Sequence, residues 1–152
     1  MNDFKECYTT LNNEEFTEYI EEYIRSLDYD TARLESLGAS LNSLGYLIIS
    51  YGAKIDIYDI ITNNEVDLTS PEVTLFGQLI IVVGYSILWI VSIRRVYTRE
   101  LRNEYLKENN RISSYEKLKS AYLLSVFANL LRLEAFYEIL INRETNIEDN
   151  EE

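Results

Sequence analysis

Five closely spaced glutamates near the start of the chain have the appearance of a carboxylate metal site. They are Glu14, Glu15, Glu18, Glu21 and Glu22. Carboxylates on the helices of a bundle can hold metal ions, but such sites usually point inward and include histidines. The chain has no histidine. We therefore interpret these glutamates as the solvated side of a helix, and we expect no metal and no other cofactor.

A second polar group, Asn129, Arg132 and Glu134, interrupts an apolar stretch near the end of the chain. These residues could line a binding site, but a hydrogen-bonded network between helices or an edge that contacts a partner explains them better. The sequence has no glycine-rich phosphate loop, nucleophile elbow or paired-cysteine metal motif. Histidine, the commonest general base, is also absent. We expect a protein that is not an enzyme.

The overall charge bears on the class of partner. The net charge is -12 and the isoelectric point is near 4.5. Binding to nucleic acid depends on Lys and Arg that neutralise phosphates, so this composition argues against a nucleic-acid partner. The single cysteine, Cys7, cannot form an internal disulfide, and we expect it to be a small apolar residue on the first helix.

Residues 73–93 form the longest uncharged run in the chain. Glu72 precedes it, and Arg94 and Arg95 follow it. As a helix, this run would be about 31 Å long, close to the ~30 Å hydrocarbon thickness of a bilayer. It is the strongest single indication of a membrane span in the sequence.

The rest of the pattern predicts an all-α protein with four helices. Glycine and proline are scarce, and apolar residues recur at spacings of three and four. A break at residues 28–30, a loop at 63–67 and another break at 109–110 divide the chain. The expected helices cover residues 14–27, 31–62, a long segment from Pro71 to about 108, and 114–142. We expect residues 1–144 to form one domain and residues 145–152 to be an acidic disordered tail.

All five glycines fall on the second and third expected helices, at intervals of seven residues. They are Gly38, Gly45 and Gly52 on one helix and Gly77 and Gly84 on the other. A glycine inside a helix costs about 1 kcal/mol relative to alanine, so close approach of two backbones is the natural compensation. The spacing predicts a central antiparallel hairpin that packs through these glycines.

Our leading interpretation is a small non-enzymatic membrane protein in which this hairpin spans the bilayer twice. Both termini would be cytoplasmic, and the protein would act through self-association, with itself or another protein as partner, or through membrane perturbation. By the positive-inside rule, the arginines that follow the uncharged run mark the cytoplasmic side, where they could contact lipid headgroups: Arg94, Arg95, Arg99 and Arg102.

The alternative is a soluble cytoplasmic four-helix bundle that serves as a structural or interaction subunit of an oligomer. The uncharged run would then be its central helix. Gln78, Tyr85 and Ser92 would need buried hydrogen-bond partners, which tyrosines, Asn129 or Arg132 on the last helix could supply. The glycine spacing fits both interpretations.

Overall fold

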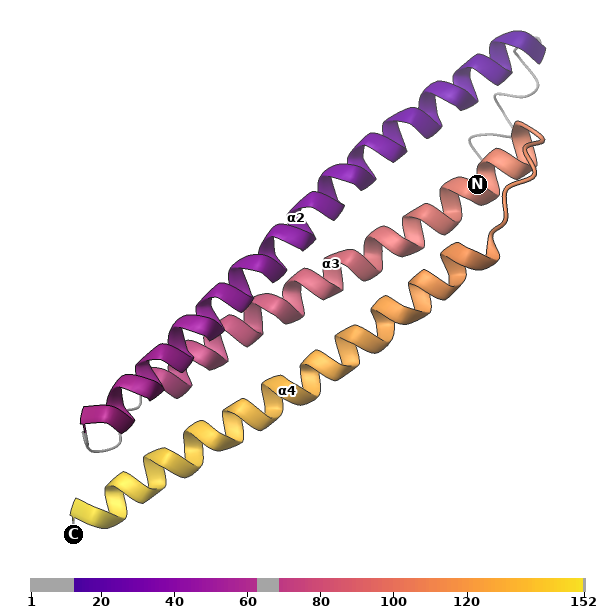
Figure 1. Cartoon of the computed structure of the whole chain (residues 1–152). Coiled ribbons are helices and arrows are strands. Elements are labelled where there is room, and N and C mark those ends of the chain that lie inside the picture. Colours follow the sequence, from indigo (N-terminus) through magenta and orange to yellow (C-terminus); the bar gives the residue numbers. More distant parts are fainter. Residues whose placement is uncertain (1–12, 63–68, 152) are drawn as a thin grey trace.

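The computed structural model describes residues 13–62 and 69–151 (Figure 1). Helix α2 covers Asn13–Thr62, α3 covers Thr69–Tyr105 and α4 covers Ser113–Glu151. No strand occurs in these two ranges. The all-α prediction is therefore confirmed. Cys7 and the whole of the expected loop at 63–67 lie outside the described residues.

The predicted break at residues 28–30 is wrong, because α2 is one continuous helix there. This segment contains aspartates and a tyrosine but neither glycine nor proline, so nothing in it prevents helical backbone geometry. Ile24 and Thr31, seven residues apart on either side, are both buried on one face. Asp28 also accepts a hydrogen bond from Arg102 of α3 at 3.1 Å. The described part of the chain therefore has three helices in place of the four expected.

Helix α3 ends in a short connection held by its own polar groups. Lys107 adopts a positive φ of 54°, and the amides of Leu106 and Glu108 donate to the carbonyl of Arg102. The side chain of Asn103 both donates to and accepts from the backbone of Asn110, at 3.0 and 2.9 Å. Helix α4 starts at Ser113, one residue before the predicted start at 114, and continues past the predicted end at 142 to Glu151, so the backbone of residues 145–151 is helical. The separate acidic tail stays a prediction.

The three helices lie side by side in an elongated, antiparallel arrangement (Figure 1). Helix α3 is central and packs against α2 on one side and α4 on the other. A small apolar core closes the end where α2 begins and α3 ends. It consists of Phe16, Ile20, Ile24 and Leu101, with the ring of Tyr105 edge-on to Phe16 at a centroid distance of 6.0 Å.

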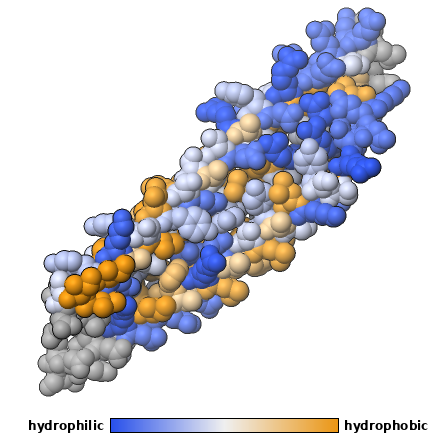
Figure 2. All heavy atoms as spheres, viewed as in Figure 1, coloured by the Kyte–Doolittle hydropathy of each residue, from blue (hydrophilic) through white to orange (hydrophobic). Residues whose placement is uncertain are grey.

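Polar and apolar residues are unevenly distributed along the molecule. In the view of Figure 2, hydrophilic residues dominate the end where α2 begins, and hydrophobic residues are more frequent over the rest of the visible face. Many large apolar side chains on all three helices are exposed, among them Leu47 of α2, Phe76 of α3 and Leu124 of α4. The fold therefore leaves apolar surface uncovered over much of its length.

Candidate functional site

The five predicted packing glycines are all buried, and the structure places them between α2 and α3. Gly45 lies opposite Gly77: a Cβ atom added to Gly45 would be 2.7 Å from the Gly77 carbonyl oxygen, and one added to Gly77 would be 2.9 Å from that of Gly45. Gly38 and Gly84 face each other in the same way, at 3.0 and 2.9 Å. A side chain at Gly45, Gly77 or Gly84 would therefore need the backbones to move apart, whereas a Cβ atom at Gly38 would make a tight contact that a small shift can relieve.

Gly52 lies opposite a residue that the glycine pattern does not include, Ser70. The Ser70 hydroxyl donates to the Gly52 carbonyl at 3.0 Å. The same seven-residue spacing continues through other buried residues, namely Val91 and Thr98 on α3 and Ile24 and Thr31 on α2. We call the contacts of Gly38, Gly45 and Gly52 with Ser70, Gly77 and Gly84 the glycine seam. A search for any small residue at this spacing would have found Ser70.

One amide is buried against the glycine seam. Asn42 is 8 % exposed, and its side chain lies over Gly84, in the space that a Cβ atom there would need. Within the described residues, its Oδ1 has no hydrogen-bond partner. Gly84 therefore makes room for both the backbone of α2 and an α2 side chain.

The contact between α3 and α4 depends on side chains instead of backbone. Gln78, 1 % exposed, donates through Nε2 to the backbone carbonyl of Asn129 at 2.9 Å and to its Oδ1 at 3.1 Å. Asn129 in turn donates to the carbonyl of Ser125 at 2.8 Å. The expectation that Asn129 supplies a partner for Gln78 is confirmed, with Gln78 as the donor and Asn129 as the acceptor.

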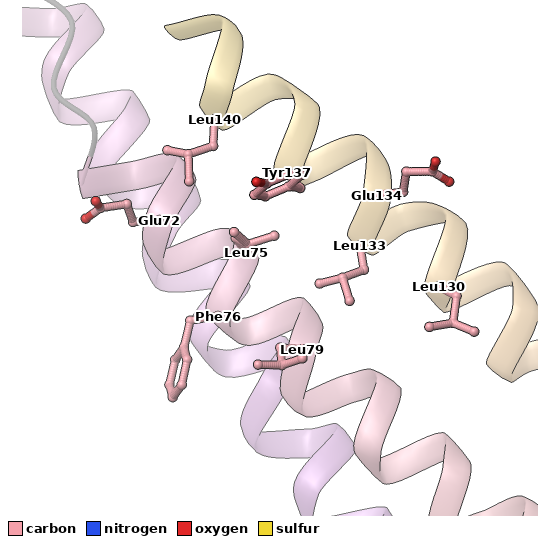
Figure 3. Close-up of a pocket in the computed structure, with 9 residues that line it drawn as sticks. All are labelled: Glu72, Leu75, Phe76, Leu79, Leu130, Leu133, Glu134, Tyr137 and Leu140. Atoms are coloured by element: carbon pink, nitrogen blue, oxygen red, sulfur yellow. The ribbon is translucent and has the colours of Figure 1, made fainter. Parts of the chain in front are cut away.

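A largely apolar groove of about 550 Å³ separates α3 from α4 beyond this amide pair (Figure 3). Leu130, Leu133 and Tyr137 of α4 point towards α3, whereas Glu134 points away. The side of α3 contributes Leu75, Phe76 and Leu79. Helices α3 and α4 are therefore less closely packed here than α2 and α3 are along the glycine seam.

The four arginines predicted to contact lipid headgroups differ in their surroundings. Arg95 pairs with Glu35 of α2, and Arg102 bridges Asp28 and Glu108 at 3.1 and 3.3 Å. The guanidinium of Arg99 lies over the ring of Tyr115, 5.2 Å from its centroid. Arg94 is exposed and lines a surface pocket with Arg33 of α2. The structure therefore does not bring the four together as one site.

The ion pairs of Arg102 shift pKa values at this end of the molecule. Burial lowers the pKa of Arg102, but the hydrogen bond to Asp28 and the charges of Asp28 and Glu108 outweigh this and raise it overall. The hydrogen bond from Asn110, followed by the charge of Arg102, lowers the pKa of Glu108. The connection after α3 is therefore held in part by an ionised Glu108.

The other polar groups considered from the sequence do not converge on a chemical centre. The five N-terminal glutamates are exposed, as are Arg132 and Glu134. Within residues 13–62 and 69–151, no three His, Cys, Asp or Glu residues are placed to hold a metal ion.

Among the described residues, one helix is long and apolar enough to cross a membrane, and it is α3. Its most apolar 18-residue stretch has a mean hydropathy of 2.1, and 44 % of that stretch is buried inside the structure. Helix α2, expected from the sequence as the second membrane span, does not meet the same criterion. No protein-family model matches the chain, and neither the curated proteins nor the solved structures include a match to it.

Proposed function

We propose that this chain is a non-enzymatic α-helical membrane protein, that α3 is its central span and that it acts by self-association within the bilayer. The observation that carries the proposal is the incomplete burial of α3. Less than half of its most apolar stretch, 44 %, is buried inside the folded chain. The central helix of a soluble bundle would be mostly covered. Lipid is the simplest cover for an uncharged helix of this length.

The exposed apolar side chains of α3 share one side of the helix, which supports this placement. Phe76, Leu79, Val83, Ile90 and Ile93 recur at spacings that keep them on one side of the helix, and each is more than 40 % exposed. Neighbouring helices expose Leu44 and Leu47 on α2 and Leu124 and Phe127 on α4. A surface of this kind is suited to lipid or to a second copy of the chain.

The positive charges support a direction of insertion. Most arginines and lysines lie towards the end where α2 begins and α3 ends: Arg25, Arg33, Arg94, Arg95, Arg99, Arg102, Lys107, Arg111, Lys117 and Lys119. Lys54, Arg132 and Arg143 lie towards the other end. Because cytoplasmic flanks are enriched in Lys and Arg, we place the first end in the cytoplasm.

The serines of α2 are compatible with its presence beside α3 in lipid. Ser40 and Ser43 are exposed, and their hydroxyls donate to the carbonyls of Ser36 and Ala39 at 2.8 and 3.1 Å. A hydroxyl bonded within its own helix does not need water. Residues 36–53 also carry no charge, so we propose that α2 accompanies α3 although it is less apolar.

The packing of α4 decides on which side of the membrane the end of this helix would lie. Because α4 runs antiparallel to α3, its last residues lie beside the start of α3, and Arg143 pairs with Asp56 of α2 at 3.5 Å. The sequence predicts that both termini are cytoplasmic. That topology would require α4 to separate from α3. With α4 in place, we propose that the N-terminal end is cytoplasmic and the end of α4 is on the other side.

The test is the behaviour of the full-length chain during cell fractionation. We expect it in the membrane pellet and expect it to resist extraction at alkaline pH, which removes peripheral proteins. Cross-linking in those membranes should yield discrete homo-oligomers. Recovery of a monodisperse protein from the soluble fraction without detergent would contradict the proposal.

One observation favours the alternative, a soluble subunit whose apolar stripes are covered by other copies. Between Lys119 and Arg132, α4 has only twelve uncharged residues, or about 18 Å of helix. This is less than the ~30 Å of a bilayer core, although lysine and arginine side chains can extend to the interface. A discrete oligomer in detergent-free buffer, measured by light scattering, would support this second function.

A further inference from the structure

Two arginines from different helices, Arg33 of α2 and Arg94 of α3, line one surface pocket of about 450 Å³. The other lining residues are Asp30, Leu34 and Leu37. From this pocket we infer that the protein binds the phosphate of an anionic phospholipid, with the guanidinium groups on the phosphate and the leucines beside the start of an acyl chain. The inference rests on the membrane placement proposed above and names the lipid that it would select.

Both arginines are free of competing carboxylates at ion-pair distance in the part of the chain that the structure describes. Arg33 lies over the ring of Tyr29, 5.9 Å from its centroid, and Arg94 is exposed. Glu35, two residues after Arg33 in α2, is paired with Arg95. Two guanidinium groups outweigh the single carboxylate of Asp30, and guanidinium groups bind phosphate oxygens through charge-assisted hydrogen bonds.

The pocket also lies at the depth where a headgroup belongs. Arg94 directly follows the uncharged run, and Leu37 lies at the start of the uncharged part of α2. Leu37 and Leu44 are separated by seven residues, so they share a face, and each is about half exposed. They provide an apolar path from the arginines towards the middle of the proposed span. A free phosphate would not use this path, which favours a phospholipid.

The experiment uses the full-length protein in neutral detergent micelles. Phosphatidylglycerol or phosphatidylcholine with matched acyl chains is titrated in, and retained lipids are counted by native mass spectrometry. We expect one phosphatidylglycerol to be retained at a concentration at least about tenfold lower than phosphatidylcholine requires, since each basic residue near a surface favours anionic lipid. Equal retention of the two lipids would overturn the inference.

Three variants test the residues. Arg33→Gln/Arg94→Gln should abolish the preference for phosphatidylglycerol, whereas Asp30→Asn should tighten phosphatidylglycerol binding about threefold by removing the one repulsive charge. The matched control is Arg111→Gln, an exposed arginine outside the pocket, and it should keep the preference. A preference that survives the double substitution would contradict the inference. The opposite effects of Asp30→Asn and the arginine variants distinguish a site from a folding defect.

Two further measurements separate the possible failures. Inorganic phosphate at the concentration of the lipid should not displace phosphatidylglycerol, and full displacement would show an anion site without lipid selectivity, which would overturn the inference. Alkaline extraction tests the membrane placement separately. If the chain stays in the membrane but shows no lipid preference, the phosphate site is rejected and the membrane placement stands. If the chain is extracted but keeps the lipid preference, the membrane span is rejected and the phosphate site stands.

Discussion

The two faces of α3 contact their neighbours by different means. Towards α2, backbone meets backbone, and a Cβ atom added to Gly45 or Gly77 would lie within 3 Å of a carbonyl oxygen of the other helix. Towards α4, the contact depends on the pair Gln78–Asn129 and then opens into a groove of about 550 Å³. At Gly45 and Gly77 the first contact has no room for a side chain, whereas the second contact has space to fill.

This difference suggests a division of roles. A contact made by backbone atoms cannot adjust by changing side-chain rotamers, so α2 and α3 should behave as one rigid hairpin. A contact made by one amide pair and a loosely filled groove can tolerate substitution and movement. We therefore expect α4 to be the helix that shifts when the protein associates, and α2–α3 to stay fixed.

The largest effect should come from filling the glycine seam. Gly45→Leu places its Cβ against the Gly77 carbonyl and Ile81. We expect the free energy of unfolding to fall by about 3 kcal/mol, since overpacking against backbone cannot relax, despite roughly 1 kcal/mol gained in helix propensity. Denaturant unfolding, monitored by circular dichroism, measures this change in the free energy of unfolding. The matched control, Ala39→Leu at an exposed position of α2, should stay within about 0.5 kcal/mol. Equal effects of the two would refute the close contact.

A smaller loss should follow removal of the amide pair. Gln78→Leu leaves the buried Asn129 Oδ1 without its donor, and we expect the free energy of unfolding to fall by about 1–2 kcal/mol. Adding Asn129→Leu should recover part of that loss, because both polar groups are then gone. A double-mutant cycle measures the coupling between the two residues. Strictly additive losses would mean that the amides do not interact.

Filling the groove between α3 and α4 should have the opposite sign. Leu133→Phe adds apolar volume to open space, and we expect a gain of about 0.5–1 kcal/mol in the free energy of unfolding. The same denaturant experiment applies. A loss similar to that of Gly45→Leu would show that the groove is closed in solution and that the two faces of α3 do not differ.

The smallest effect concerns the connection from α3 to α4. The pKa of Glu108 is lowered in the folded chain, so its carboxylate favours folding above the unfolded pKa of about 4.3, and this contribution disappears as the pH falls through the folded pKa. We expect Glu108→Gln to lower the midpoint of thermal unfolding slightly at pH 7, and we expect this difference to shrink as the pH falls below about 4.3. A difference that grows on acidification would contradict the assigned pKa direction.

The sequence alone is sufficient to predict some of these structural features. The period of the apolar residues predicts all-helical structure, and the predicted helix starts at Pro71 and at residue 114 lie close to the observed starts of α3 and α4, Thr69 and Ser113. The seven-residue interval indicates which face of each helix carries the glycines. Asn129 was among the partners expected for Gln78 because both are polar residues in apolar surroundings.

Other features depend on contacts that local patterns do not contain. The aspartates at 28 and 30 resemble a turn, yet Arg102 of α3 binds Asp28 and the buried face continues through Thr31. The register that places Gly45 opposite Gly77 needs both helices at once. The pairing of Arg33 with Arg94 in one pocket likewise joins residues distant in sequence. The charge pattern alone groups Arg94 with three other arginines, of which the fold pairs Arg95 and Arg102 with acids.

The most direct test of the close α2–α3 contact is a disulfide across the glycine seam, far from the α2–α3 connection. A Cβ atom at Gly38 would lie 3.2 Å from Cγ2 of Ile87, near the roughly 3 Å between a Cβ and the partner sulfur in a disulfide. Gly38→Cys/Ile87→Cys is made with Cys7→Ser, oxidised mildly and digested with trypsin, which should release residues 34–54 and 55–94 as one linked peptide. Linkage no greater than that of the control Ala39→Cys/Ile87→Cys would contradict the contact.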